Sequence, residues 1–176
     1  MYDEFADYLH NYAIWTASRA AQRGFTTTAK ISKAINAAKL RHEIHDSDIQ
    51  WTKDIFWERH QIWIEEMGIS LRSSKVAEEK ITYGRLAKVV AVYIKTSIIL
   101  PNKGVGLLSG VAHPPIDRVL LKMKWATLKK NTFEALPAWT NLNKENYYKI
   151  INILIENDKP FWMIEKDWKP AEAEEE

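Results

Sequence analysis

The chain has 176 residues, 46% of them hydrophobic, no cysteine and a formal net charge of +2. This length predicts one domain whose core is large enough to fold without disulfides or a structural metal. The absence of cysteine excludes thiol nucleophiles, cysteine-ligated zinc and iron–sulfur clusters, and it fits a reducing compartment.

Apolar residues recur at spacings of three and four and glycine is scarce, so the sequence predicts an all-α fold of six or seven helices. The first helix spans about residues 3–23 and ends at Gly24. One stripe of this helix carries Phe5, Tyr8, Tyr12 and Trp15. A second helix is expected to run to about residue 42, with one of the threonines at 26–28 as its N-cap.

The third helix is expected to begin at a cap formed by Asp46 or Ser47 and to end at Gly68. His60 falls on its apolar stripe. We interpret this histidine as a hydrogen-bonded core residue rather than a ligand.

The most apolar segment, residues 81–100, is predicted to form the buried central helix of the domain. Its three cations make a membrane span unfavourable, because each costs about 2.5–3.5 kcal/mol near the bilayer centre. Pro101 ends this helix, and the next helix is expected to begin at Pro114 or Pro115.

Asn143 is the expected N-cap of a sixth helix, and a last short helix covers about residues 161–168. Together these elements predict a single helical domain over residues 1–170. The acidic segment 171–176 has little to bury and is expected to be disordered. The acidic, charge-interrupted N-terminus does not resemble a signal peptide, so we expect a cytoplasmic protein.

Charge is strongly segregated along the chain. Residues 1–70 carry 8 basic and 10 acidic side chains, residues 71–130 carry 12 and 3, and residues 131–176 carry 5 and 10. A block with net charge +9 is typical of a surface that binds phosphate. The alternative is that the acidic ends fold onto this block and cancel its charge.

Six cations in the basic block form the candidate nucleic-acid-binding set, and three of them share one stripe of the 81–100 helix. The set is Arg85, Lys88, Lys95, Lys103, Arg118 and Lys122. We expect them to form a basic edge that contacts nucleic acid or another anionic partner.

Tryptophan is unusually frequent, with eight residues: Trp15, Trp51, Trp57, Trp63, Trp125, Trp139, Trp162 and Trp168. We expect most of them to be core residues. If several prove exposed in one patch, they would instead support a subunit-interaction role or a homo-oligomer.

No motif fixes a reaction: the Walker, GxGxxG, HExxH and GxSxG patterns are all missing. His42, His45 and Asp46 have a spacing that metal ligands can use, but the same residues suit a helix C-terminus followed by a cap. We favour the cap, and therefore predict no metal and no other cofactor.

The segment around His113 and Asp117 is the strongest candidate for chemistry. If Pro114 is an N-cap, Asp117 falls at the third helical position without its usual backbone partner, because proline has no N–H. Two interpretations stay open. Asp117 forms an ion pair with the Arg85/Lys88 edge of the long helix, or it works with His113 as an acid–base pair.

Three segments of the second half resemble a family of small helical bacterial and phage proteins. They are YGRLAKVVAVYIK (83–95), HPPIDRVLL (113–121) and PAWTNLN (137–143). The resemblance implies a helical fold and no particular activity.

A further resemblance is to the helix-hairpin-helix DNA glycosylases, because Gly104-Val105-Gly106 precedes Asp117 and Arg118. It implies a hairpin that contacts DNA backbone and a catalytic role for Asp117. The stretch between hairpin and aspartate is shorter than in that family, and no lysine directly follows the hairpin.

Nucleic-acid or anion binding is thus the expected function. A glycosylase-like enzyme that acts on a base and a non-enzymatic subunit-interaction protein are the alternatives.

Overall fold

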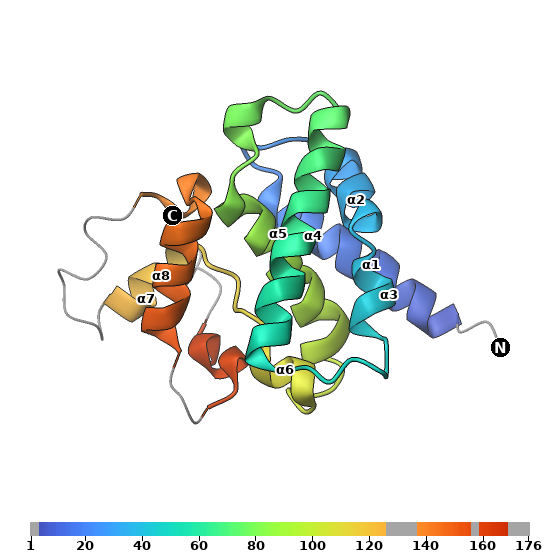
Figure 1. The fold of residues 1–176 in the computed structure, drawn as a ribbon, viewed down its shortest axis with the longest axis vertical. Helices are drawn as coiled ribbons and strands as arrows, with labels where there is room; N and C mark the ends of the chain where they lie inside the picture. Colours follow the sequence, from blue (N-terminus) through green and yellow to red (C-terminus); the bar gives the residue numbers. More distant parts are fainter. Residues whose placement is uncertain (1–3, 126–136, 156–158, 169–176) are drawn as a thin grey trace, which may run out of the picture.

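The computed structural model describes residues 4–125, 137–155 and 159–168. These residues form a compact all-α fold of eight α-helices and no strands, as predicted (Figure 1). The predicted acidic tail, residues 171–176, lies outside the described residues. Among the described residues, no helix is both long and apolar enough to cross a membrane.

The α-helices are α1 (Glu4–Ala21), α2 (Thr28–Ala37), α3 (Leu40–Ile44), α4 (Lys53–Ser73), α5 (Tyr83–Ile94), α6 (Leu107–Val111), α7 (Arg118–Trp125) and α8 (Lys144–Leu154). Short 3₁₀ turns lie at η1 (Glu78–Lys80), η4 (Trp139–Asn141) and η5 (Phe161–Glu165), and a π-helical turn, η2 (Lys95–Ile99), continues α5.

Helix α5 is the centre of the fold and packs against α1, α4 and α8. Nine of its twelve residues are buried, the largest share of any described α-helix, and four of the five residues of η2 are buried as well. The prediction of a buried central helix over 81–100 is therefore confirmed, with the α-helical part beginning at Tyr83.

The N-terminus of α5 is fixed by a close approach to η4. Thr82 caps the helix by accepting from the Arg85 N–H and donates its own hydroxyl to the Thr140 carbonyl at 2.6 Å. A Cβ at Gly84 would lie 2.1 Å from the Trp139 carbonyl oxygen. Glycine is needed here because any larger residue would push η4 away from α5.

Local capping explains several helix starts. Thr27 caps α2, and Asn143 caps α8 as predicted. The expected start of the third helix is wrong, because Thr52 caps α4 and not Asp46 or Ser47. That helix also continues through Gly68 to Ser73, since a buried glycine is tolerated inside a helix when tertiary packing supports it.

Lys39 breaks the predicted second helix. Its backbone is left-handed, with φ 53°, so the segment becomes two helices, α2 and α3. A short helix, α6, also forms inside the expected connection between 101 and 113. These two elements bring the described residues to eight α-helices rather than six or seven, while the helix predicted at 161–168 is the 3₁₀ turn η5.

The aromatic stripe of α1 faces outward. Phe5, Tyr8, Tyr12 and Trp15 are 68%, 65%, 49% and 56% exposed, whereas Ala13, Ala17 and Ala21 are buried. The other described tryptophan side chains mostly follow the prediction: Trp51 and Trp63 are buried, Trp57, Trp139 and Trp162 pack against the core, and only Trp168 is also exposed. The Trp125 side chain lies outside the described part of the chain.

Replacing Val90 with aspartate should unfold the protein. Val90 is fully buried in α5, and an unpaired carboxylate there costs several kcal/mol out of a total stability of about 5–15 kcal/mol. Circular dichroism during thermal unfolding measures the effect. Val105→Asp is the matched control, because Val105 is 72% exposed and the same change there should leave the midpoint nearly unchanged. A Val90→Asp variant with the parental midpoint would contradict the central position of α5.

Candidate functional site

The three predicted cations of the long helix do not form an exposed row. Arg85 donates to the Gly24 carbonyl at 2.9 Å and lies over the Phe25 ring. Lys88 forms an ion pair with Asp117, with Nζ and Oδ2 3.2 Å apart. Their charges are thus used inside the fold.

Lys95 is tied to the C-terminal part of the chain. Its ammonium pairs with the Glu165 carboxylate of η5 and lies over the Trp168 ring. Lys88 is held in a similar way, with its ammonium 4.5 Å from the centre of the Trp139 ring. The interpretation that the acidic C-terminal third cancels part of the basic block holds for the Lys95–Glu165 pair.

Both ion pairs line one groove, which we call the α5 groove. It has a volume of about 330 Å³ and runs along α5 and η2 between α1 and η5. Its lining residues are Thr16, Ala20, Lys88, Val92, Lys95, Thr96, Leu100, Pro115, Asp117, Glu165 and Trp168. The groove therefore holds two ammonium groups and two carboxylates between partly apolar walls.

Asp117 begins α7, so the predicted start at Pro114 or Pro115 is wrong. Its Oδ1 accepts the Leu120 N–H at 2.9 Å, which makes Asp117 the N-cap, and the helix starts at Arg118. Pro114 and Pro115 precede the helix, and Ile116 between them and the cap is buried in the core. The predicted ion pair between Asp117 and the long helix is confirmed by Lys88.

Glu165 is the member of the groove that the sequence did not indicate. Its side chain is only 9% exposed. Burial raises the pKa of this carboxyl, and the neighbouring Lys95 partly offsets that effect. No motif surrounds Glu165, and its partner lies 70 positions earlier in the chain, so no local signal could have identified it.

Lys95 lies at the first position of a π-helical turn. The Leu100 N–H donates to the Lys95 carbonyl at 2.9 Å, the wider bond of a π-helix. Thr96 and Ser97 add side-chain bonds to carbonyls one turn earlier. Such turns are rare and occur frequently at functional sites.

His113 lies in the core and not beside Asp117. Its Nδ1 is 3.2 Å from the Tyr147 hydroxyl, and its ring contacts Phe56 and His60 with 4.8 Å between centres. Asp117 instead faces Lys88 in the groove. The structure therefore does not bring together the predicted acid–base pair.

His60 belongs to the same buried aromatic cluster, as predicted for a core histidine. Its Nδ1 lies 3.3 Å from the Tyr83 hydroxyl and 3.4 Å from that of Tyr148. Burial lowers the pKa of His60 to about 3 and lowers that of His113 well below its usual value. Both rings are therefore neutral at neutral pH.

The remaining three predicted cations are exposed. Lys103 lies in the turn of residues 101–106 between η2 and α6, which we call the hairpin. Arg118 and Lys122 lie on α7. Figure 1 shows α6 and α7 in different parts of the molecule, joined by the segment 112–117. The six cations therefore do not form one continuous edge.

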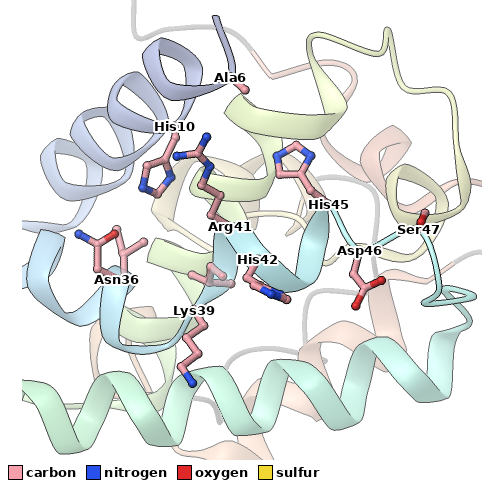
Figure 2. Close-up of a pocket in the computed structure, with 11 residues that line it drawn as sticks. Ala6, His10, Asn36, Lys39, Arg41, His42, His45, Asp46 and Ser47 are labelled. Carbon is pink, nitrogen blue, oxygen red and sulfur yellow. The ribbon is translucent and has the colours of Figure 1, made fainter. Parts of the chain in front are cut away.

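Another pocket lies between α1, α2 and α3 (Figure 2). Its volume is about 830 Å³. Arg41 lies between His10 and His45, whereas the side chains of His42 and Asp46 point away from Arg41 (Figure 2). Burial and then the Arg41 charge lower the pKa of both His10 and His45.

Two of the polar side chains of this pocket are paired with residues outside its lining. Arg41 forms an ion pair with Asp7 at 2.5 Å, and His10 Nδ1 lies 2.6 Å from the Tyr93 hydroxyl. Among the described residues, no group of three or more histidine, aspartate or glutamate side chains is arranged to hold a metal ion. The alternative metal site at His42, His45 and Asp46 is therefore not formed.

Comparisons with protein-family models, with curated proteins and with solved structures find no match to this chain. The resemblances to the small bacterial and phage family and to the helix-hairpin-helix glycosylases therefore stay predictions.

The stability of the protein should fall in acid because of the buried histidines. An unfolded histidine titrates near pH 6.5, while His60 titrates near 3 in the fold. Between these values the unfolded state binds more protons, so stability is complete above about pH 6.5 and decreases towards pH 3, by up to about 1.4 kcal/mol per pH unit for each histidine.

Urea unfolding followed by tryptophan fluorescence at pH 7.5 and pH 5.0 measures this effect. In His60→Gln the dependence on pH should become shallower, because one of the four histidines with a lowered pKa is lost. An unfolding free energy that is the same at both pH values in the parent protein would contradict the neutral buried pair.

Asp117→Asn should destabilise the fold through its charge alone. Asparagine is an equally good N-cap, but it leaves the ammonium of Lys88, whose side chain is only 12% exposed, without a counter-charge. We expect a loss of about 1–3 kcal/mol in urea unfolding. Adding Lys88→Met should recover part of that loss. Equal stability of parent and single variant would show that the ion pair does not hold α7 to α5.

Proposed function

We propose that the chain is a cytoplasmic nucleic-acid-binding protein whose main contact is the hairpin of residues 101–106. The observation that carries the proposal is the composition and geometry of this hairpin. It combines an exposed lysine with exposed apolar side chains on a backbone held in glycine-dependent conformations.

The tip of the hairpin is suited to a close approach to a sugar–phosphate backbone. Lys103 is exposed and left-handed, with φ 54°, and Gly104 and Gly106 have φ 75° and 107°. Val105 and Leu107 are 72% and 60% exposed, so they are free to contact sugars or bases. A cation beside a bare glycine backbone is a common way to bind phosphate.

The hairpin is also held in place by the rest of the fold. A Cβ at Gly104 would lie 2.7 Å from the Trp162 indole, so the backbone rests directly on that ring. The Gly104 N–H donates to the Ile99 carbonyl at 2.8 Å. A contact loop fixed in this way loses little conformational entropy on binding.

Arg118 and Lys122 supply a second cationic place on α7. They are one turn apart and exposed, and both belong to the predicted basic edge. We keep both in the proposed nucleic-acid-binding set. Lys88 and Lys95 are not part of the proposed nucleic-acid-binding set, because their ammonium groups face carboxylates.

Lys103→Gln should weaken binding to a fluorescent DNA duplex of random sequence. Log affinity falls with log salt, and we expect the magnitude of this negative slope to become smaller by about 0.9 for each lost phosphate contact. Fluorescence anisotropy at several low salt concentrations measures both quantities. Arg118→Gln should act in the same direction.

Lys75→Gln is the matched control. Lys75 is also exposed and left-handed, with φ 57°, but it lies at the end of α4, away from the hairpin. Its replacement should leave affinity and salt slope unchanged. Failure of the parent protein to bind DNA or RNA at low salt would overturn the proposal.

A second candidate function is hydrolysis of a base from nucleic acid in the α5 groove. The observation that favours it is the pair of carboxylates, Asp117 and Glu165, in a groove of about 330 Å³, a volume within the range of small-molecule sites. In such a reaction water adds to the sugar carbon while the glycosidic bond breaks, Asp117 accepts the proton of the water, and the raised pKa of Glu165 suits it to protonate the leaving base.

Release of free base from a duplex with damaged bases tests this candidate. Asp117→Asn and Glu165→Gln should each abolish release while leaving DNA binding through the hairpin intact. A parent protein that binds DNA and releases no base contradicts the second candidate and leaves the first in place.

A further inference from the structure

The outward face of α1 carries a continuous row of aromatic rings. Ring centres are 6.4 Å apart from Phe5 to Tyr8, 6.4 Å from Tyr8 to Tyr12 and 5.7 Å from Tyr12 to Trp15. All four side chains are about half exposed or more. We call this row the α1 aromatic stripe.

The stripe lies on the side of α1 that the described fold does not cover. The residues that pack on the core are Ala13, Ile14, Ala17, Ser18 and Ala21. At 100° per residue these point in the direction opposite to the stripe. Figure 1 also shows the N-terminal turns of α1 projecting beyond the other helices. Contiguous apolar surface of this kind marks an interaction site.

Charged side chains flank the two ends of the stripe with opposite signs. Glu4 lies at the N-terminal end and Arg19 at the C-terminal end, and both are exposed. An antiparallel copy of the same helix would place each of these charges opposite its counter-charge. A stripe that binds itself in this way is charge-complementary without any further partner.

One register pairs both charges and also brings Tyr8 opposite Trp15. When residues whose numbers add to 23 face each other, Glu4 lies opposite Arg19 of the second copy and Tyr8 lies opposite its Trp15. Four half-exposed aromatic side chains supply roughly 500 Å² of contact surface per copy, near the lower limit for a specific dimer.

From these observations we propose that two copies of this chain form a two-fold symmetric dimer through the α1 aromatic stripe, with the two α1 helices antiparallel. Single-stranded nucleic acid is the less suitable occupant. Stacking of bases on such a row requires a track of cations for the phosphates, and the stripe has one cation and one carboxylate at its ends.

Sedimentation equilibrium and light scattering at several protein concentrations test the dimer. The parent protein should show a concentration-dependent dimer, and Tyr8→Lys should raise the dissociation constant at least about tenfold. Ile69→Lys is the matched control, because Ile69 is 48% exposed on α4 and its replacement should leave the dissociation constant unchanged. Circular dichroism should show that both variants are folded.

A charge exchange tests the antiparallel register. Glu4→Arg alone and Arg19→Glu alone should each weaken the dimer, since each places like charges opposite each other at both ends. The double variant should restore the affinity of the parent. In a parallel dimer Glu4 faces Glu4, so the single variants would cause no such loss.

Two results would overturn the proposal. One is a parent protein that stays monomeric up to about 0.5 mM, where an interface of this size should be populated. The other is a dimer whose dissociation constant does not change in Tyr8→Lys. Both results are independent of DNA binding, which depends on the hairpin.

Discussion

Lys88 of α5 and Lys95 of the adjoining turn η2 carry two ammonium groups, and each is paired with a carboxylate from a distant segment. An unpaired charge in a protein interior costs several kcal/mol, so Lys88 and Lys95 determine where Asp117 and Glu165 lie. A tryptophan ring beside each lysine adds a cation–π contact. The start of α7 and the turn η5 are therefore each tied by an ion pair to α5 or η2, although they follow these elements by many residues.

The turn η5 connects the groove with the proposed nucleic-acid contact. Glu165 at its end pairs with Lys95, while Trp162 near its start supports the hairpin backbone at Gly104. The turn η5 is only five residues long, so these two contacts come from neighbouring residues. The hairpin and the groove therefore share one supporting element.

Much of the fold could be predicted because its signals are local. The buried character of 81–100 and the cap at Asn143 need only neighbouring residues. The start of α7 could not be predicted, because a Pro-Pro pair suits both a first helical turn and an extended segment. Burial of His113 and Ile116 decides between them, and that depends on tertiary contacts. The pairing of Lys95 with Glu165 could not be predicted either, because it also depends on tertiary contacts. Of the predicted site, the pairing of Asp117 was foreseen, whereas the fully buried position of His113 was not.

Helix α1 shows what periodicity leaves open. The sequence pattern identifies a stripe of large aromatic side chains and an opposite stripe of alanines, but it does not say which one faces the core. Close packing of two helices requires small residues at the crossing, and Ala13, Ala17 and Ala21 let α1 approach α5. The alanines of α1 face the buried side chains of α5, and the four rings lie on the other side of the helix. Among the described residues the aromatic face of α1 stays exposed, and the proposed dimer gives that face a partner.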